Sequence, residues 1–141
     1  MKTKNFFLLT ISLLLITGVG CENKQEPTFE IYENREASAC GIKDPLKNID
    51  WIKDYCTKHS KSFLETMYIY KNKVENTDYI VIETSTEYDS SRSPSSVQTT
   101  SVYSCKGELI LFYGTEGQKP SNWDKFFQEN EVKSKLWSVK Q

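Results

Sequence analysis

The segment DPLKNIDWIKDYCTKHSKSF, residues 44–63, carries the clearest structural pattern in the chain. Asp44 is a residue type that favours the N-cap of a helix, and Pro45 suits the first helical position, where its missing N–H is not needed. When successive residues are placed 100° apart, one broad sector contains Ile49, Trp51, Ile52, Tyr55, Cys56, His59 and Phe63. The pattern predicts an amphipathic helix from about Pro45 to Ser62 that packs one side against a larger element.

The residues that follow indicate a β-sheet as that larger element. Leu64–Tyr70 and Tyr79–Thr84 are rich in aromatic and β-branched residues, and turn-forming residues separate them. Gln98–Cys105 and Glu108–Tyr113 form a second pair, closed by Lys106–Gly107, where glycine tolerates a positive φ. The sequence therefore predicts at least four antiparallel strands.

Three further features complete the predicted fold. The run LILFY, residues 109–113, is apolar on both faces and favours a central strand. Ser121 with Asp124 is similar to an acidic capping box and predicts a short helix to about Glu131, and Lys135–Val139 alternates as a final strand. The expected fold class is α+β: an N-terminal amphipathic helix packed on a four- to five-stranded antiparallel sheet, with a short C-terminal helix.

The first 21 residues have the layout of an export signal. Lys2 and Lys4 form a basic head, Phe6–Val19 is mostly apolar, and the small residue Gly20 precedes Cys21. The apolar run is shorter than the roughly 20 residues that a membrane-spanning helix needs, and glycines interrupt its end. One possible outcome is an ordinary cleaved signal peptide that leaves Cys21 as a free thiol.

A cysteine directly after these small residues resembles the lipobox of bacterial lipoproteins, with Gly18 where that motif usually has leucine. The resemblance implies that Cys21 is lipidated and becomes the new N-terminus. A diacylglyceryl group plus an N-acyl chain would hold the protein on a membrane almost permanently, whereas one chain alone binds reversibly. The expected location is the bacterial cell envelope, on the periplasmic or surface face of a membrane.

Length and charge define the expected domain organisation. Residues 1–20 form the predicted signal peptide, and the 121 residues after it are enough for one domain. Residues 21–39 are charged and poor in apolar side chains, so we expect a lipidated Cys and a flexible tether, with an edge strand at Thr28–Glu33 as the alternative. Residues 40–141 form a single α+β domain. Loss of Lys2 and Lys4 changes the formal net charge from −1 to −3, a mild acidity that gives no indication of nucleic acid binding.

Three cysteines remain besides Cys21, and export to an oxidising compartment predicts one disulfide and one unpaired thiol. Cys40 lies just before the predicted helix, and Cys105 closes a predicted strand. Because both lie at the edges of elements, we favour a Cys40–Cys105 disulfide with Cys56 reduced. A Cys56–Cys105 disulfide is the alternative, since the helix must cross the sheet.

Candidate chemistry centres on the only histidine, His59, three residues after Cys56 on the same predicted helix face. A zinc site needs three or four ligands, and a cysteine in an apolar sector acts as a small hydrophobic residue, although Cys40 and Cys105 could complete a set. Cys-His catalysis also needs an orienting group and an oxyanion site, for which the sequence gives no signal. We expect no catalytic residues, no metal and no cofactor, and a protein that is not an enzyme.

Short motifs are similar to those of a family of small bacterial lipoproteins. They are the block ACGIKDPL at residues 39–46, the turn YSCKGE at residues 103–108 and the pair Leu136–Trp137. The resemblance spans most of residues 39–141 and implies a location and an architecture rather than a particular activity. The Ser-rich segment Ser85–Ser96 replaces one that is often shorter and contains cysteine in relatives.

These features favour a membrane-anchored, non-enzymatic binding module of the cell envelope, with an unidentified protein or small molecule as ligand. A contiguous exposed patch of Tyr68, Tyr70, Tyr79 and Tyr113 would favour binding. The alternative is an inhibitor or immunity-type protein that blocks a secreted enzyme by inserting the loop Ser85–Ser96, although an inert loop suits this composition better. A hydrolase with a pair of carboxylates would need an acidic pocket.

Overall fold

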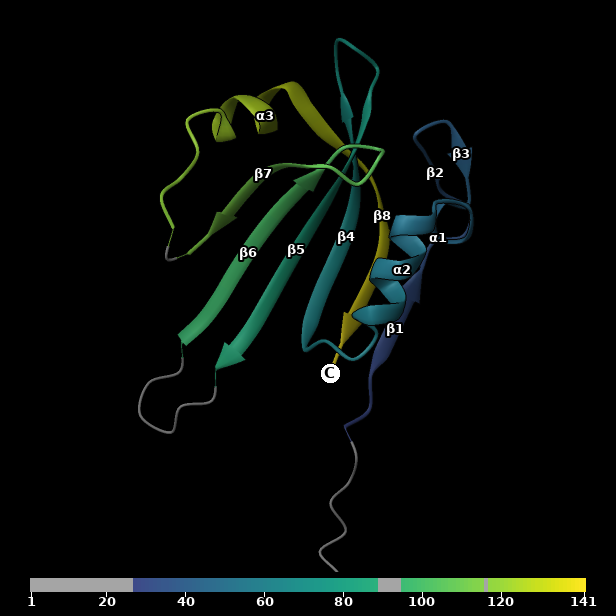
Figure 1. The fold of residues 1–141 in the computed structure, drawn as a ribbon, viewed down its shortest axis with the longest axis vertical. Helices are drawn as coiled ribbons and strands as arrows, with labels where there is room; N and C mark the ends of the chain where they lie inside the picture. Colours follow the sequence, from purple (N-terminus) through teal and green to yellow (C-terminus); the bar gives the residue numbers. More distant parts are fainter. Residues whose placement is uncertain (1–26, 89–94, 116) are drawn as a thin grey trace, which may run out of the picture.

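The computed structural model describes residues 27–88, 95–115 and 117–141, so the predicted leader and Cys21 lie outside the described residues (Figure 1). In chain order, the helices and strands are β1 (Glu30–Glu33), β2 (Ser38–Ala39), β3 (Ile42–Lys43), α1 (Pro45–Asn48), α2 (Asp50–Lys58), β4 (Leu64–Asn72), β5 (Asp78–Tyr88), β6 (Ser95–Tyr103), β7 (Leu109–Gly114), α3 (Trp123–Glu129) and β8 (Asn130–Lys140). Among the described residues, no helix has the length and apolar character needed to cross a membrane.

Six strands form one antiparallel sheet in the order β1-β8-β4-β5-β6-β7, and β2 pairs with β3 in a separate hairpin. The α+β class, the antiparallel sheet and the short C-terminal helix are therefore confirmed. The expected four to five strands are corrected to six. Strand β8 returns from the far end of the chain to pair with β4, which places it inside the sheet rather than at its edge.

Strand β1 forms where the sequence favours a flexible tether, so that prediction is wrong for Glu30–Glu33 and the edge-strand alternative is right. β1 pairs with the eleven-residue strand β8, with Ile31 opposite Val139. All four β1 side chains are exposed, so backbone pairing rather than burial holds the strand. Apolar content alone therefore gives little indication that this segment forms a strand.

The predicted helix over residues 45–62 is two helices, because Ile49 adopts an extended conformation with φ −112° and ψ 106°. The second helix ends at Lys58 rather than near Ser62. Asp44 occupies the N-cap position in a left-handed conformation, and its side chain makes no capping hydrogen bond. The carboxylate instead lies 3.6 Å from the Arg35 guanidinium, so an ion pair replaces the expected cap.

The turn predicted at Lys106–Gly107 is present between β6 and β7. Gly107 has φ +83°, and a Cβ added there would lie 2.9 Å from the Trp51 ring. The Trp51 indole N–H donates a hydrogen bond to the Cys105 carbonyl at 3.1 Å. Glycine is therefore required both by the backbone conformation and by the close approach of α2 to this turn.

The sheet has a hydrophobic core on each face. Helices α1 and α2 cover one face, where the buried residues are Ala37, Ala39, Leu46, Ile49, Ile52, Met67, Ile69, Ile80, Ile82, Leu136, Trp137 and Val139. Helix α3 covers part of the other face, over Val81, Val102 and Leu111. Ile80 and Ile82 belong to the first core and Val81 to the second, as the alternation of a β-strand requires.

Strand β7 is an edge strand, so the prediction of a central strand at residues 109–113 is wrong. Leu109, Ile110 and Phe112 are 56%, 43% and 52% exposed. The tight turn after β6 lays β7 along the outside of β6, and β8 adds to the sheet on the far side, beside β4. Burial on two faces therefore does not explain this apolar run.

Helix α3 begins at Trp123, with Asn122 at the N-cap and no side-chain capping hydrogen bond. The capping box expected from Ser121 and Asp124 is therefore absent, and Asp124 pairs with Lys119 instead. The helix ends at Glu129, where β8 begins directly at Asn130. Its stability comes mainly from the aromatic side chains that it packs on the sheet.

Candidate binding surfaces

The disulfide Cys40–Cys105 is present, with Cα atoms 5.7 Å apart, and Cys56 is free, as the sequence favours. The bond joins the turn of the β2–β3 hairpin to the turn after β6. It closes a loop with a sequence separation of 65. This cross-link holds the N-terminal part of the domain on the sheet.

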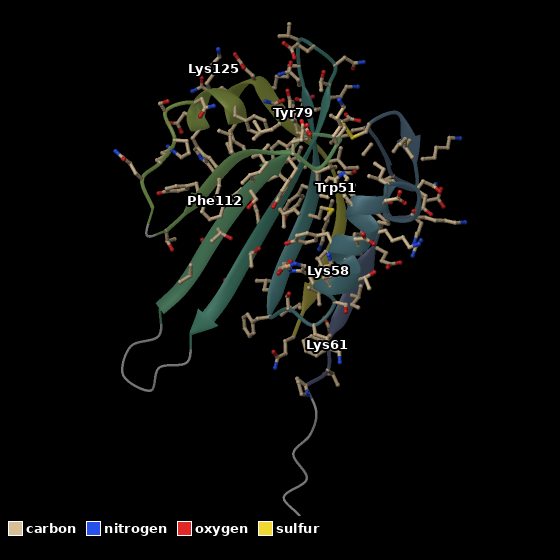
Figure 2. All side chains as sticks on the ribbon, viewed as in Figure 1. Trp51, Lys58, Lys61, Tyr79, Phe112 and Lys125 are labelled. Atoms are coloured by element: carbon tan, nitrogen blue, oxygen red, sulfur yellow. A yellow bond between two sulfur atoms is a disulfide. The ribbon has the colours of Figure 1, made fainter. Side chains whose placement is uncertain are left out.

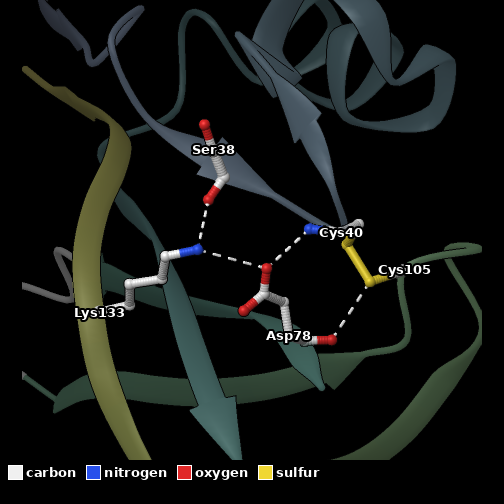
Figure 3. Close-up of polar contacts among 5 residues, drawn as sticks. All are labelled: Ser38, Cys40, Asp78, Cys105 and Lys133. Atoms are coloured by element: carbon white, nitrogen blue, oxygen red, sulfur yellow. Dashed lines mark hydrogen bonds and ion pairs between the residues drawn. A yellow bond between two sulfur atoms is a disulfide. The ribbon is translucent and has the colours of Figure 1, made fainter. Parts of the chain in front are cut away.

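An ion pair lies beside the disulfide (Figure 3). Asp78 Oδ2 accepts a hydrogen bond from the Cys40 backbone N–H at 2.8 Å and lies 3.4 Å from Lys133 Nζ. Lys133 also donates to the Ser38 carbonyl at 2.7 Å. The Cys105 sulfur has no hydrogen in the disulfide, so its 3.2 Å approach to the Asp78 carbonyl is a close contact only. The sequence gives no signal for this cluster, because its members are far apart along the chain.

His59 contacts a buried carboxylate. His59 Nδ1 lies 2.8 Å from Glu65 Oε1, and the Tyr55 hydroxyl donates to Glu65 Oε2 at 2.9 Å. The Tyr55 and His59 rings stack with centroids 4.0 Å apart. Glu65 is only 4% exposed, so this network anchors α2 to β4. The sequence analysis did not identify Glu65. A charged residue in a strand gives no indication that it faces the core until its hydrogen-bond partners, here Tyr55 and His59, are known.

Burial raises the pKa of the half-buried Cys56 thiol to about 12, which leaves little thiolate at neutral pH. Burial also raises the pKa of Tyr55, helped by the charge of Glu65. In the described part of the chain, no group of three or more His, Cys, Asp or Glu residues is arranged to hold a metal ion.

The pKa of Cys56 predicts a loss of stability in alkali. Between about pH 9 and about pH 12, the Cys56 thiol keeps its proton in the folded protein and releases it in the unfolded chain. The free energy of unfolding should therefore fall as the pH rises through this range. Below about pH 9 the thiol is protonated in both states, so the contribution of Cys56 to the free energy of unfolding is fully present. Urea unfolding from neutral to alkaline pH measures the decline, which Cys56→Ala should make shallower. An identical decline in that variant would show that the thiol is not responsible.

The four tyrosines considered as a binding patch, Tyr68, Tyr70, Tyr79 and Tyr113, are all partly buried. Tyr70 and Tyr79 pack against α3, where the Tyr79 and Phe126 ring centroids are 5.3 Å apart. The Tyr113 ring lies 5.2 Å from that of Trp123. Tyr70, Tyr79 and Tyr113 therefore contact α3 rather than forming an exposed apolar patch.

The end of this face near Leu64 carries two adjoining hollows of about 270 and 350 Å³, which share Leu64 and Thr66. Their lining is mainly polar, with Glu83, Gln98 and Thr100 in one hollow and Ser138 and Lys140 in the other. These side chains could meet a hydrogen-bonding ligand, and Leu64, Ile31 and Tyr32 add apolar surface.

The edge at β7 is an open surface with apolar side chains. Its outer side has no neighbouring strand among the described residues, and Leu109, Ile110 and Phe112 are exposed along it. An extended segment could pair with the free backbone groups of this edge. Figure 1 shows β7 at the opposite side of the sheet from β1.

The described residues form an α+β fold with a six-stranded antiparallel sheet, and its edge strand β7 carries exposed apolar side chains. Comparisons with protein families, curated proteins and solved structures found no match for this chain. Cys21 and the centre of the Ser-rich loop, residues 89–94, lie outside the described residues.

Proposed function

We propose that this chain is a lipid-anchored binding module of the bacterial cell envelope, and that the edge strand β7 receives an extended segment of a partner protein. The exposed apolar edge of β7 is the observation that carries this proposal. Exposed, flat edges are a liability in soluble proteins, which normally cover, charge or shorten them. Three large apolar side chains on six residues favour a surface that a partner covers.

The topology supports different roles for the two edge strands of the sheet, membrane attachment near β1 and partner binding at β7. The segment from Cys21 enters the fold at β1, one edge, and β7 is the other. Strands lie about 4.8 Å apart, so the two edges are separated by about 24 Å. A lipid on Cys21 would therefore hold one edge to the membrane and leave β7 accessible.

The contacts of the reactive side chains support a role in binding rather than catalysis. The histidine ring bonds the buried Glu65 carboxylate, and the free Cys56 thiol is kept protonated by burial. These residues therefore stabilise the helix on the sheet.

Site-specific photo-crosslinking in the native cell tests the proposal. Benzoylphenylalanine would replace Ile110 or Phe112, with Val74 in the β4–β5 turn, 87% exposed, as the matched control. Ile110 and Phe112 should crosslink to one short segment of a single partner, at partner residues two positions apart, because alternate residues of a strand share a face. Val74 should not capture this segment.

Three outcomes would contradict the proposal. The β7 positions would give no crosslink, Val74 would capture the same segment, or the captured chain would be a second copy of this protein.

A further inference from the structure

A cleft lies between α2 and β1, on the sheet face that carries the helices. Its volume is about 390 Å³, within the size range of small-molecule sites. It is separate from the β7 edge, because β1 and β7 are the two ends of the strand order. The cleft therefore needs its own explanation.

The floor of the cleft is apolar. Leu46 and Trp137 form part of it and are 5% and 1% exposed. Ile31 forms a wall and is 51% exposed, so it contributes apolar surface that the fold leaves uncovered. The Cys56 thiol also lines the cleft and stays uncharged at neutral pH. Such a floor suits a hydrocarbon portion of a ligand.

The rim of the cleft carries an excess of positive charge. Arg35 is paired with Glu33 at 2.7 Å, and both line the cleft. Lys47 and Lys53 also line it, and among the described residues neither has a carboxylate within 4.0 Å. The net charge of the whole chain is −1, whereas the charge at the rim of this cleft is positive. A ligand that complements this rim carries an anionic group.

We propose that this cleft binds a free, single-chain fatty acid of medium length. Its carboxylate would lie at the Lys47–Lys53 rim and its tail over Trp137. The volume, at the low end for small-molecule sites, favours one chain over a two-chain lipid. This inference does not depend on the β7 proposal, and either can fail alone.

Protection of Cys56 provides the test. The full chain carrying Cys21→Ser retains Cys56 as its only free thiol and would be purified without detergent. The rate at which N-ethylmaleimide modifies Cys56 would be followed by mass spectrometry with decanoate or with decyltrimethylammonium, each below its micelle concentration. Decanoate should slow the modification about tenfold, and the cation with the same tail should change it less than about twofold.

Two charge-reversal variants separate the rim from the general charge of α2. Lys47→Glu with Lys53→Glu should abolish protection by decanoate, measured as the ratio of the modification rates with and without decanoate in the same variant. Lys58→Glu with Lys61→Glu is the matched control, because both lysines are exposed, do not line the cleft and lie at the end of α2 and just beyond it (Figure 2). This control should keep the protection.

Three results would overturn the proposal. They are no protection by decanoate, equal protection by the cationic amphiphile, and equal loss of protection in the two double variants.

Discussion

Replacing Cys40 and Cys105 together with alanine should lower the free energy of unfolding by about 4 kcal/mol, because the disulfide closes a loop of 65 residues in sequence separation. The cross-link restricts the unfolded chain, and it also joins the β2–β3 turn to the turn after β6. Urea unfolding of the oxidised protein and the double variant measures the difference.

Cys56→Ala is the control for this experiment, since it removes a cysteine that forms no disulfide. It should cost clearly less than the double variant. A double variant within about 1 kcal/mol of the parent protein would contradict the structural role given to the cross-link.

Trp137→Ala should destabilise the fold by about 3–5 kcal/mol, the usual cost of removing a buried tryptophan side chain. Trp137 is 1% exposed, and its strand β8 pairs with both β1 and β4. The truncation would leave a cavity in the core between the sheet and the helices α1 and α2.

Val132→Ala on the same strand is the matched control, because Val132 is 52% exposed and should change stability by less than about 0.5 kcal/mol. The urea midpoints of the two variants, each compared with that of the parent protein, measure these losses of stability. Similar losses in the two variants would mean that β8 does not face the core in the register described.

Local patterns in the sequence predicted those parts of the fold that depend on local physics. The β6–β7 turn needs a glycine with positive φ, and Gly107 provides it. The disulfide was also predictable, since Cys40 and Cys105 lie at element edges while Cys56 lies in the apolar sector of the helix. The position of β7 was not, because LILFY has the same composition in a buried strand and in an exposed apolar edge.

The same limit applies to the candidate surfaces. The sequence contains the apolar residues of β7, but only the strand order reveals that they lie at an open edge. The cleft combines Ile31, Lys53 and Trp137. The pairing of β1 with β8 brings Ile31 close to Trp137, and α2 supplies Lys53. That pairing depends on backbone hydrogen bonds, for which the exposed side chains of β1 give almost no signal.

In the proposed function, a lipid on Cys21 would determine where the protein acts and which edge of its sheet faces away from the membrane. Mass spectrometry of the N-terminal peptide from native material tests it most directly. We predict that the mature chain begins at Cys21 and that this residue carries acyl chains. An unmodified Cys21, or a chain that retains residues 1–20, would contradict it.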